Sequence, residues 1–241
     1  MRAQTRHQLK EDRFSKTTVE VAEKTLHWSA EHQNKLIVAG IVLLVIVGLA
    51  FAGWYYTNQQ DQKASVEFSK AVRTLDTPIR PPNMPPQPEV VSFASINERA
   101  TAAHKQFEQI VNNYPHTHAA DFSHYFLGLT SATMGNNSDA ERELQTVASY
   151  HNKELAALAK FALASVYRDT NRDKQAIDLY KDLSAKPTAT VSKTTAQMEL
   201  AATYQSANMP LEAKRTYEQI QKENPATEAA QLASAKLQAL K

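Results

Sequence analysis

Three histidines and an aspartate form the local group in this sequence most suited to binding a metal ion. They follow Pro115 in the order His116, His118, Asp121 and His124. Imidazole nitrogens and carboxylate oxygens are ligands for zinc and nickel, so the group could hold such an ion. On a helix, however, His118 and Asp121 stand three residues apart, whereas His124 is six residues from His118 and lies further round. We interpret these histidines as solvated side chains at a helix corner and predict no metal site.

The sequence contains no other recognisable catalytic motif. It has no cysteine, which excludes disulfides, thiolate metal sites and thiol nucleophiles. None of its five glycines belongs to a phosphate-binding loop, and no serine has the glycine-flanked setting of a nucleophile elbow. Asp139, Glu141 and Glu143 fit the start of a helix, where the helix dipole favours negative charge. We predict that the protein is not an enzyme and binds no cofactor.

An apolar segment, Leu36–Tyr55, holds twenty consecutive residues without a charge. As a helix it would extend over roughly 30 Å, the hydrocarbon thickness of a bilayer. Aromatic rings follow at its C-terminal end, where membrane interfaces favour them. The sequence therefore predicts one transmembrane helix over residues 36–56. The alternative is a signal peptide cleaved near Ala52, which the length of the preceding segment disfavours.

The distribution of basic residues predicts how this helix is oriented. Residues 1–35 carry seven Lys and Arg against five Asp and Glu, whereas residues 57–241 carry twenty of each. The positive-inside rule then places the N-terminal tail in the cytoplasm. The C-terminal part is predicted to lie in the periplasm, with the helix in a bacterial inner membrane. Its neutral charge offers no footprint for nucleic acid.

The segments on either side of the apolar run have their own patterns. Apolar residues at helical spacing predict a juxtamembrane helix over residues 17–33, which would lie on the headgroups or dock a cytoplasmic partner. A continued helix is expected from Thr57 to Leu75, and 57–93 is assigned to it together with a proline-rich insertion. Six of the ten prolines lie in residues 78–88, which predicts an extended linker or a ligand for another protein.

Residues 94–241 repeat themselves at intervals of 36 or 37 residues. A small residue and a bulky residue four positions later recur in step, which indicates paired helices that approach closely. These registers are Ala103, Ala140, Ala176 and Ala213, then Phe107, Leu144, Tyr180 and Tyr217. A third register contains Leu127-Gly128, Leu163-Ala164 and Leu200-Ala201, with Ser131, Tyr167 and Tyr204 four residues after each leucine.

Local signals predict where these helices begin and end. Capping boxes are expected at Ser95 with Glu98 and at Ser138 with Glu141. Pro210 fits a first helical turn, where its missing amide is harmless. The turns within hairpins should contain Gly135, Asn171 and Asn208, and a last helix should cover Glu228–Leu240.

The registers resemble the tetratricopeptide repeat, an α-hairpin that stacks into a superhelix, over about Asn97–Thr227. The family repeat has about 34 residues, so we assign the excess to longer loops near Tyr150–Lys153 and Pro187–Thr190. Because prolines prevent a helix just before Ser95, the first hairpin should use Thr57–Leu75 as its partner helix. The predicted fold is all-α, a single N-terminal transmembrane helix followed by an α-solenoid of tetratricopeptide-like hairpins.

The resemblance implies a protein-binding concave face lined by the first helix of each hairpin. By register, its residues would be Phe122, Tyr125, Leu129, Phe161, Ser165, Arg168, Met198, Ala202 and Gln205. Packing between hairpins is the alternative role for the aromatic residues and the methionine. The basic clamp of some family members is not matched, because its positions hold Tyr125, Leu129, Ala162, Thr195 and Glu199.

The order of tail, membrane helix and repeats is similar to that of the ancillary subunits of the bacterial SecYEG translocon. That resemblance implies a membrane-tethered interaction module whose partners are the translocon, periplasmic chaperones and exported chains. The alternative is a self-associating envelope scaffold or cell-division and assembly coordinator. In that case Gly48 and Ala52, a small-xxx-small pair, would join the spans into a homo-oligomer.

Overall fold

The computed structural model describes residues 32–82, 85 and 91–240 of this chain. The helix predicted over residues 17–33 and much of the proline-rich insertion lie outside these described residues. The helices of the described part are α2 (Gln33–Asp76), α3 (Ile96–Asn113), α4 (His118–Thr133), α5 (Asn137–Ala148), α6 (Lys153–Asp169), α7 (Asp173–Ala185), α8 (Lys193–Ser206), α9 (Pro210–Glu223) and α10 (Glu228–Ala239). The fold is all-α, as predicted, and the chain divides into two compact units at Asn58.

The described part of the first unit is the apolar helix. Side chains from Ile37 to Asn58 are all exposed, including Leu44 at 72% and Leu49 at 69%. Of the described helices, α2 alone is long and apolar enough to cross a membrane. A signal sequence near the N-terminus also meets these criteria of length and composition, so these properties do not distinguish the two. The transmembrane assignment therefore stays a prediction.

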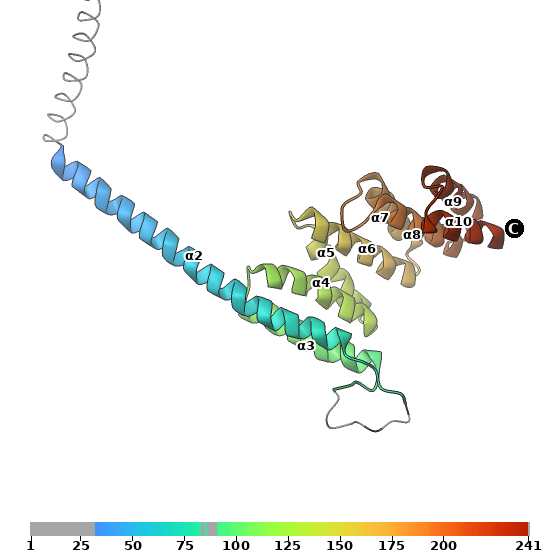
Figure 1. Ribbon diagram of the computed structural model, residues 1–241, viewed down its shortest axis with the longest axis horizontal. Coiled ribbons are helices and arrows are strands. Elements are labelled where there is room, and N and C mark those ends of the chain that lie inside the picture. The colour runs from blue at the N-terminus through green and yellow to red at the C-terminus, as the bar shows by residue number, and fades with distance from the viewer. Residues whose placement is uncertain (1–31, 83–84, 86–90, 241) are drawn as a thin grey trace, which may run out of the picture. The chain divides into compact units, whose positions relative to one another are not determined.

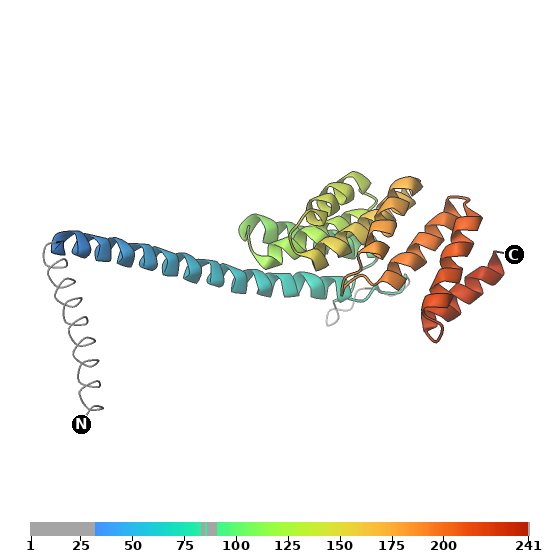
Figure 2. The ribbon, with the colours of Figure 1, turned by 90° about the horizontal axis from the view of Figure 1, so that it is seen from above.

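The second unit is a stack of helical hairpins (Figure 1). The part of α2 from residue 59 to 76 packs with α3, and the pairs α4–α5, α6–α7 and α8–α9 follow. Figure 2 shows the same succession from above, ending in α10 beside α9. Each helix contacts the next along the chain, which is the geometry of a solenoid.

Aromatic rings join α2 to the next two helices. Phe68 on α2 meets the ring of Phe107 on α3 at 5.8 Å and that of Phe126 on α4 at 5.7 Å between centroids. Phe107 and Phe126 stack at 4.9 Å with an interplanar angle of 9°. Ala64, one turn before Phe68, is fully buried in the same cluster. The continued helix is thus the partner of α3, as the sequence predicted.

Hydrogen bonds close the base of the proline-rich insertion. The Arg80 amide donates to the Phe93 carbonyl at 2.9 Å, and the Phe93 amide donates to the Pro78 carbonyl at 3.1 Å. The Arg99 guanidinium on α3 donates to the Thr77 carbonyl at 3.0 Å. These bonds hold the two ends of the insertion together, so α3 can fold back along α2.

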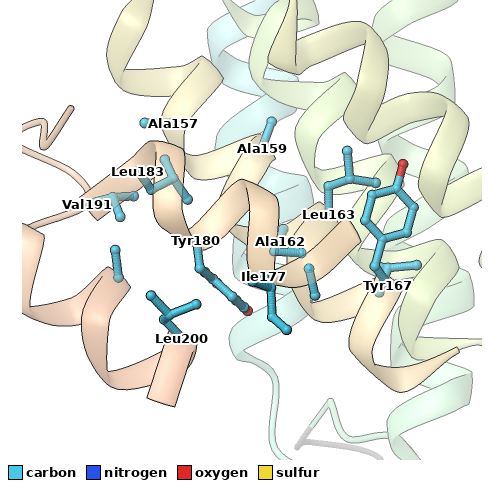
Figure 3. Close-up of a cluster of buried hydrophobic side chains, with 14 of the residues drawn as sticks. Ala157, Ala159, Ala162, Leu163, Tyr167, Ile177, Tyr180, Leu183, Val191 and Leu200 are labelled. Atoms are coloured by element: carbon cyan, nitrogen blue, oxygen red, sulfur yellow. The ribbon is translucent and has the colours of Figure 1, made fainter. Parts of the chain in front are cut away.

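The repeat registers form the hydrophobic core. The four register alanines are 0% exposed, and the bulky residues that follow them are 0–1% exposed. Figure 3 shows this core around Tyr180, which lies between Leu200 of the next hairpin and Ala162 of its own. Gly128 is needed in its register, because a β-carbon there would lie 2.6 Å from Cγ of Leu144. Along the stack, small residues that let two helices approach closely thus alternate with bulky residues that fill the space between them.

Helix boundaries follow the predictions with two exceptions. Ser95 caps α3, accepting from the Glu98 amide at 3.0 Å, and Pro210 stands in the first turn of α9. The capping box predicted at Ser138 is wrong: α5 begins at Asn137, so Ser138 falls inside the first turn. The longer loop predicted near Tyr150–Lys153 is also wrong. The α5–α6 connection (residues 149–152) is no longer than the α9–α10 connection (residues 224–227). The connection 186–192 is extended, as predicted.

Candidate protein-binding surface

The first helices of the hairpins adjoin on one side of the solenoid. Contacts join α4 to α6 and α8 to α10, whereas no two second helices make comparable contacts within the described residues. A stack whose first helices are closer together than its second helices curves toward the first helices. These contacts favour the side of α4, α6 and α8 as the concave side, and these helices carry all nine of the predicted binding residues.

Helix α4 presents an aromatic surface to this side. It starts at Thr117, whose hydroxyl caps the helix. Phe122 is 38% exposed and lies 6.2 Å from the Phe68 ring, at the edge of the aromatic cluster. Tyr125 and Leu129 are half-buried against the hydrophobic core. Burial raises the pKa of the Tyr125 phenol, so this residue stays neutral at physiological pH.

Helix α6 contributes an aromatic residue and an ion pair. Phe161 is half-buried and meets the Tyr180 ring edge-on at 5.4 Å. Ser165 is likewise half-buried. The Arg168 guanidinium is not a free cation, since its Nη1 donates to Oε2 of Glu199 on α8 at 2.6 Å. This charge-assisted bond ties two first helices together across the surface.

Helix α8 is less aromatic. Met198 is half-buried against the core, and the neighbouring Ala202 is also half-buried. The Gln205 amide oxygen accepts from the Tyr217 hydroxyl of α9 at 2.8 Å. Gln205 therefore supports the packing of its own hairpin, in addition to any contact it makes with a partner.

Two leucines extend the surface beyond the predicted set. Leu158, which is 36 residues after Phe122, is half-buried against the core. Leu232 on α10 is 50% exposed and stands 37 residues after Thr195. The repeat interval itself would have identified both positions. Glu199, the partner of Arg168, had no such signal, because a pairing between side chains 31 residues apart depends on the packing of α6 and α8.

The histidines that follow Pro115 do not converge. His124 Nδ1 lies 2.8 Å from Oε2 of Glu143 on α5, and the His118 amide donates to the carboxylate of Asp61 at 3.3 Å. Among the described residues, no group of three His, Cys, Asp or Glu side chains could hold a metal ion. His124 instead connects the two helices of its hairpin.

The bond to His124 makes Glu143 sensitive to acid. It is the main reason that the pKa of the Glu143 carboxyl is lower than usual, against an opposing effect of burial. Because the pKa is lowered, the ionised Glu143 carboxylate stabilises the folded state. This stabilisation is complete at pH values above the ordinary glutamate pKa, and it is lost as the pH falls through the pKa of the folded state. We expect Glu143→Gln to cost about 1 kcal/mol at pH 7 and less at pH 4.

The measurement for this prediction is urea unfolding of the full chain and the Glu143→Gln variant at both pH values. Other carboxylates also titrate in this range, so the difference between the two proteins is the relevant quantity. Glu218→Gln, at an exposed pair whose closest distance to Lys214 is 3.8 Å, serves as control and should show no such change. A cost that stays constant from pH 7 to pH 4 would contradict the assignment.

Comparison with known proteins agrees with this geometry. The model of the family described as "Tetratricopeptide repeat-like domain" matches residues 26–240. A crystal structure of a Podospora anserina kinesin light chain protein with nearly identical TPR-like repeats is similar, with a TM-score of 0.56 and 16% sequence identity. That match covers 75% of this chain and 85% of the other. At this identity the likeness concerns the fold alone. Among curated proteins, no significant match is found.

The family match, the repeat registers and the buried core lead to one conclusion. The match covers most of the sequence, and the residues that define the repeat are the ones that are buried. Repeats of this kind stack into extended concave surfaces for binding, so the chain is a protein–protein interaction module. This chain belongs to the tetratricopeptide repeat-like domain family.

Proposed function

We propose that the chain is a membrane-tethered interaction module of the bacterial inner membrane. The observation that supports this most is α2 itself, which begins as an uncharged apolar helix with exposed side chains and continues into the first hairpin. A contiguous apolar surface of this kind requires a cover that water cannot provide. In this proposal the bilayer covers it, the N-terminal tail is cytoplasmic and the repeats are periplasmic.

The partners we propose are the secretion translocon, periplasmic chaperones and exported chains. Two arguments support them: the similarity in architecture to ancillary translocon subunits, and an apolar stripe at one end of the concave face. Phe122, Tyr125 and Phe161 would contact the apolar segments that a chain exposes before it folds. The tether keeps the module near the site of translocation, which raises its effective concentration, so weak contacts suffice.

In-cell photocrosslinking tests this proposal. Photoreactive residues are placed at Tyr125, Phe161 and Met198 of the full chain, and captured proteins are identified by mass spectrometry. Lys105, an exposed residue on α3, is the matched control position. We expect translocon subunits, chaperones or exported chains to be captured from the three concave positions and not from Lys105. Capture of none of them above a span-only protein would contradict the translocon role.

A self-associating scaffold is the second candidate. A β-carbon built at Gly48 would meet no atom within 4 Å, so this face of the helix is open to a neighbouring helix. Ala52 lies one turn further, completing a small-xxx-small pair. If the spans associate, the same crosslinking experiment would capture the protein itself. Light scattering of the detergent-solubilised chain showing a monomer would exclude this role.

A further inference from the structure

A cavity of about 480 Å³ lies at the junction of two hairpins, and none of the nine predicted concave-face residues lines it. The connection from α5 to α6 supplies Tyr150, and the first turns of α6 supply Ala156 and Ala157. The extended connection after α7 supplies Pro187. The cavity thus forms where the chain passes from one repeat to the next, and the protein–protein contact argued so far does not use it.

Three lysines and one aspartate surround this cavity: Lys153, Lys160, Lys186 and Asp182. Lys160 Nζ lies 2.9 Å from one oxygen of Asp182, and Lys186 Nζ lies 2.9 Å from the other. Hydrogen bonds from Lys186 and Lys160 hold the pKa of the Asp182 carboxyl below its usual value, so it remains ionised. Among the side chains that line the cavity, one negative charge therefore faces three positive charges, while the carboxylates of Asp121 and Glu143 act on Tyr150 at its edge.

The ammonium groups keep hydrogen-bonding capacity for a ligand. Each lysine ammonium has three N–H donors, and Lys160 and Lys186 each direct one of them to Asp182. Lys153, in the first turn of α6, has no carboxylate within 4.0 Å among the residues that the structure describes. Several donors are thus available at one cavity, and lysines outnumber carboxylates among the side chains that line it.

The lysines are not part of the repeat pattern. At the next junction, 37 residues later in the register, Gln197 stands in place of Lys160 and Glu223 stands in place of Lys186. At the preceding junction, 36 residues earlier, His124 stands in place of Lys160. Stacking of the hairpins therefore does not require lysines at these positions. Of the three junctions compared, only this one brings the lysines together.

We propose that this cavity binds a carboxylate group of a partner polypeptide, either a chain terminus or an acidic side chain. The lysine donors would hold the carboxylate, and the small apolar floor formed by Ala148, Ala156 and Ala157 would accept the adjoining aliphatic carbons. The inference deepens the proposed function by naming the chemistry of a contact. It does not depend on the concave face being the main binding surface.

The test uses the full chain in an uncharged detergent and three peptides of uncharged residues, each with an uncharged fluorophore. The first ends in a free carboxylate, the second is its C-terminal amide, and the third is the amide with one internal glutamate. Fluorescence anisotropy gives the affinities. We expect the first or the third peptide to bind at least about tenfold tighter than the second, and the difference to shrink in 0.5 M salt. Which of the two binds identifies the source of the carboxylate.

Paired variants assign the binding to the cavity. The double substitution of Lys153→Gln and Lys186→Gln should weaken it about threefold to tenfold, because exposed ion pairs are individually weak. Asp182→Asn should strengthen it, since both lysines lose a competing carboxylate, and a purely structural role for Asp182 would not have this sign. The matched control is Lys174→Gln with Lys181→Gln, on the same helix α7, which should leave the affinity unchanged.

Several results would overturn the proposal. Equal binding of the amide, no binding at about millimolar protein, or an unchanged affinity in the first double variant would each do so. Displacement of the peptide by inorganic phosphate at much lower concentration than by acetate would also overturn it, because the cavity would then prefer a different anion. Crosslinking from Phe161 reports on the concave face, so its failure would be distinguishable from failure here.

Discussion

Replacing Phe107 with alanine is expected to lower the free energy of unfolding of the repeat domain by about 3–5 kcal/mol. Phe107 is 0% exposed and is packed against Phe68 of α2 and Phe126 of α4, so its removal leaves a cavity where three helices meet. Because a solenoid contacts only its neighbours, the loss should act first on the hairpin formed by α2 and α3. Urea unfolding followed by circular dichroism should show an early separate transition.

Phe122→Ala is the matched control for this change. Phe122 belongs to the same aromatic cluster, but it is 38% exposed and touches Phe68 only at the edge. We expect its replacement to cost about 1 kcal/mol or less, and to reduce crosslinking of partners from Phe161 on the next first helix. Equal destabilisation by the two substitutions would mean that the first hairpin does not close over the aromatic cluster as described.

The core could be predicted from the sequence because repetition makes the same packing problem appear several times. Ala103 and its equivalents must be small for two helices to approach, and Phe107 and its equivalents must fill the space that remains. Both requirements recur at the interval of 36 or 37 residues, so they are visible without any knowledge of distance. The pairing of α2 with α3 followed from the same reasoning, since the prolines exclude a closer helix.

Individual polar pairs could not be predicted in this way. Arg168 with Glu199 and His124 with Glu143 are each made once, by side chains on different helices whose rotation decides whether they meet. The capping box at Ser138 failed for a related reason. Its Glu141 is engaged by the Arg172 guanidinium at 2.7 Å, and the helix begins two residues earlier than the motif predicts, at Asn137 with Asn136 as its N-cap.

The candidate site contains both predictable features, which follow from the repeat, and unpredictable ones, which depend on individual side chains. The helices that carry the nine concave-face residues follow from the register, but their exposure does not. Tyr125, Leu129 and Met198 are half-buried against the core, and Gln205 is occupied by Tyr217, so part of the predicted face also serves packing. The lysine cavity was not predicted, because its charged residues come from both helices of a hairpin and from a connection that departs from the repeat.

The apolar N-terminal half of α2 raises the question of what covers its exposed side chains. The repeat domain from residue 59 onward has its own core, and none of the membrane-length window of α2 is buried inside the chain. Exposed apolar side chains over such a length favour aggregation in water. In the proposed function a bilayer covers them, and the competing cover is another polypeptide. These two covers respond differently to charge placed in the helix.

Two opposite charges at the centre of the apolar segment, Val45→Asp with Ile46→Lys, should abolish membrane association. Each charged residue at the centre of a membrane helix costs about 2.5–3.5 kcal/mol, and the pair leaves the net charge of the chain unchanged. The wild-type chain should remain with membranes after alkaline extraction, whereas the variant should be released. Val66→Asp with Ser69→Lys, at exposed positions further along α2, is the matched control and should behave as wild type.

The absence of native cysteines allows the same proteins to report orientation. A single cysteine introduced at Lys105, an exposed position on α3, should react with a membrane-impermeant maleimide in spheroplasts of the wild type. The charged variant, left in the cytoplasm, should not react. If the charged variant stayed with the membrane and kept its labelling, a bound polypeptide would have to cover the apolar helix. Labelling of the wild type only after lysis would instead place the repeats, and with them the lysine cavity, on the cytoplasmic side.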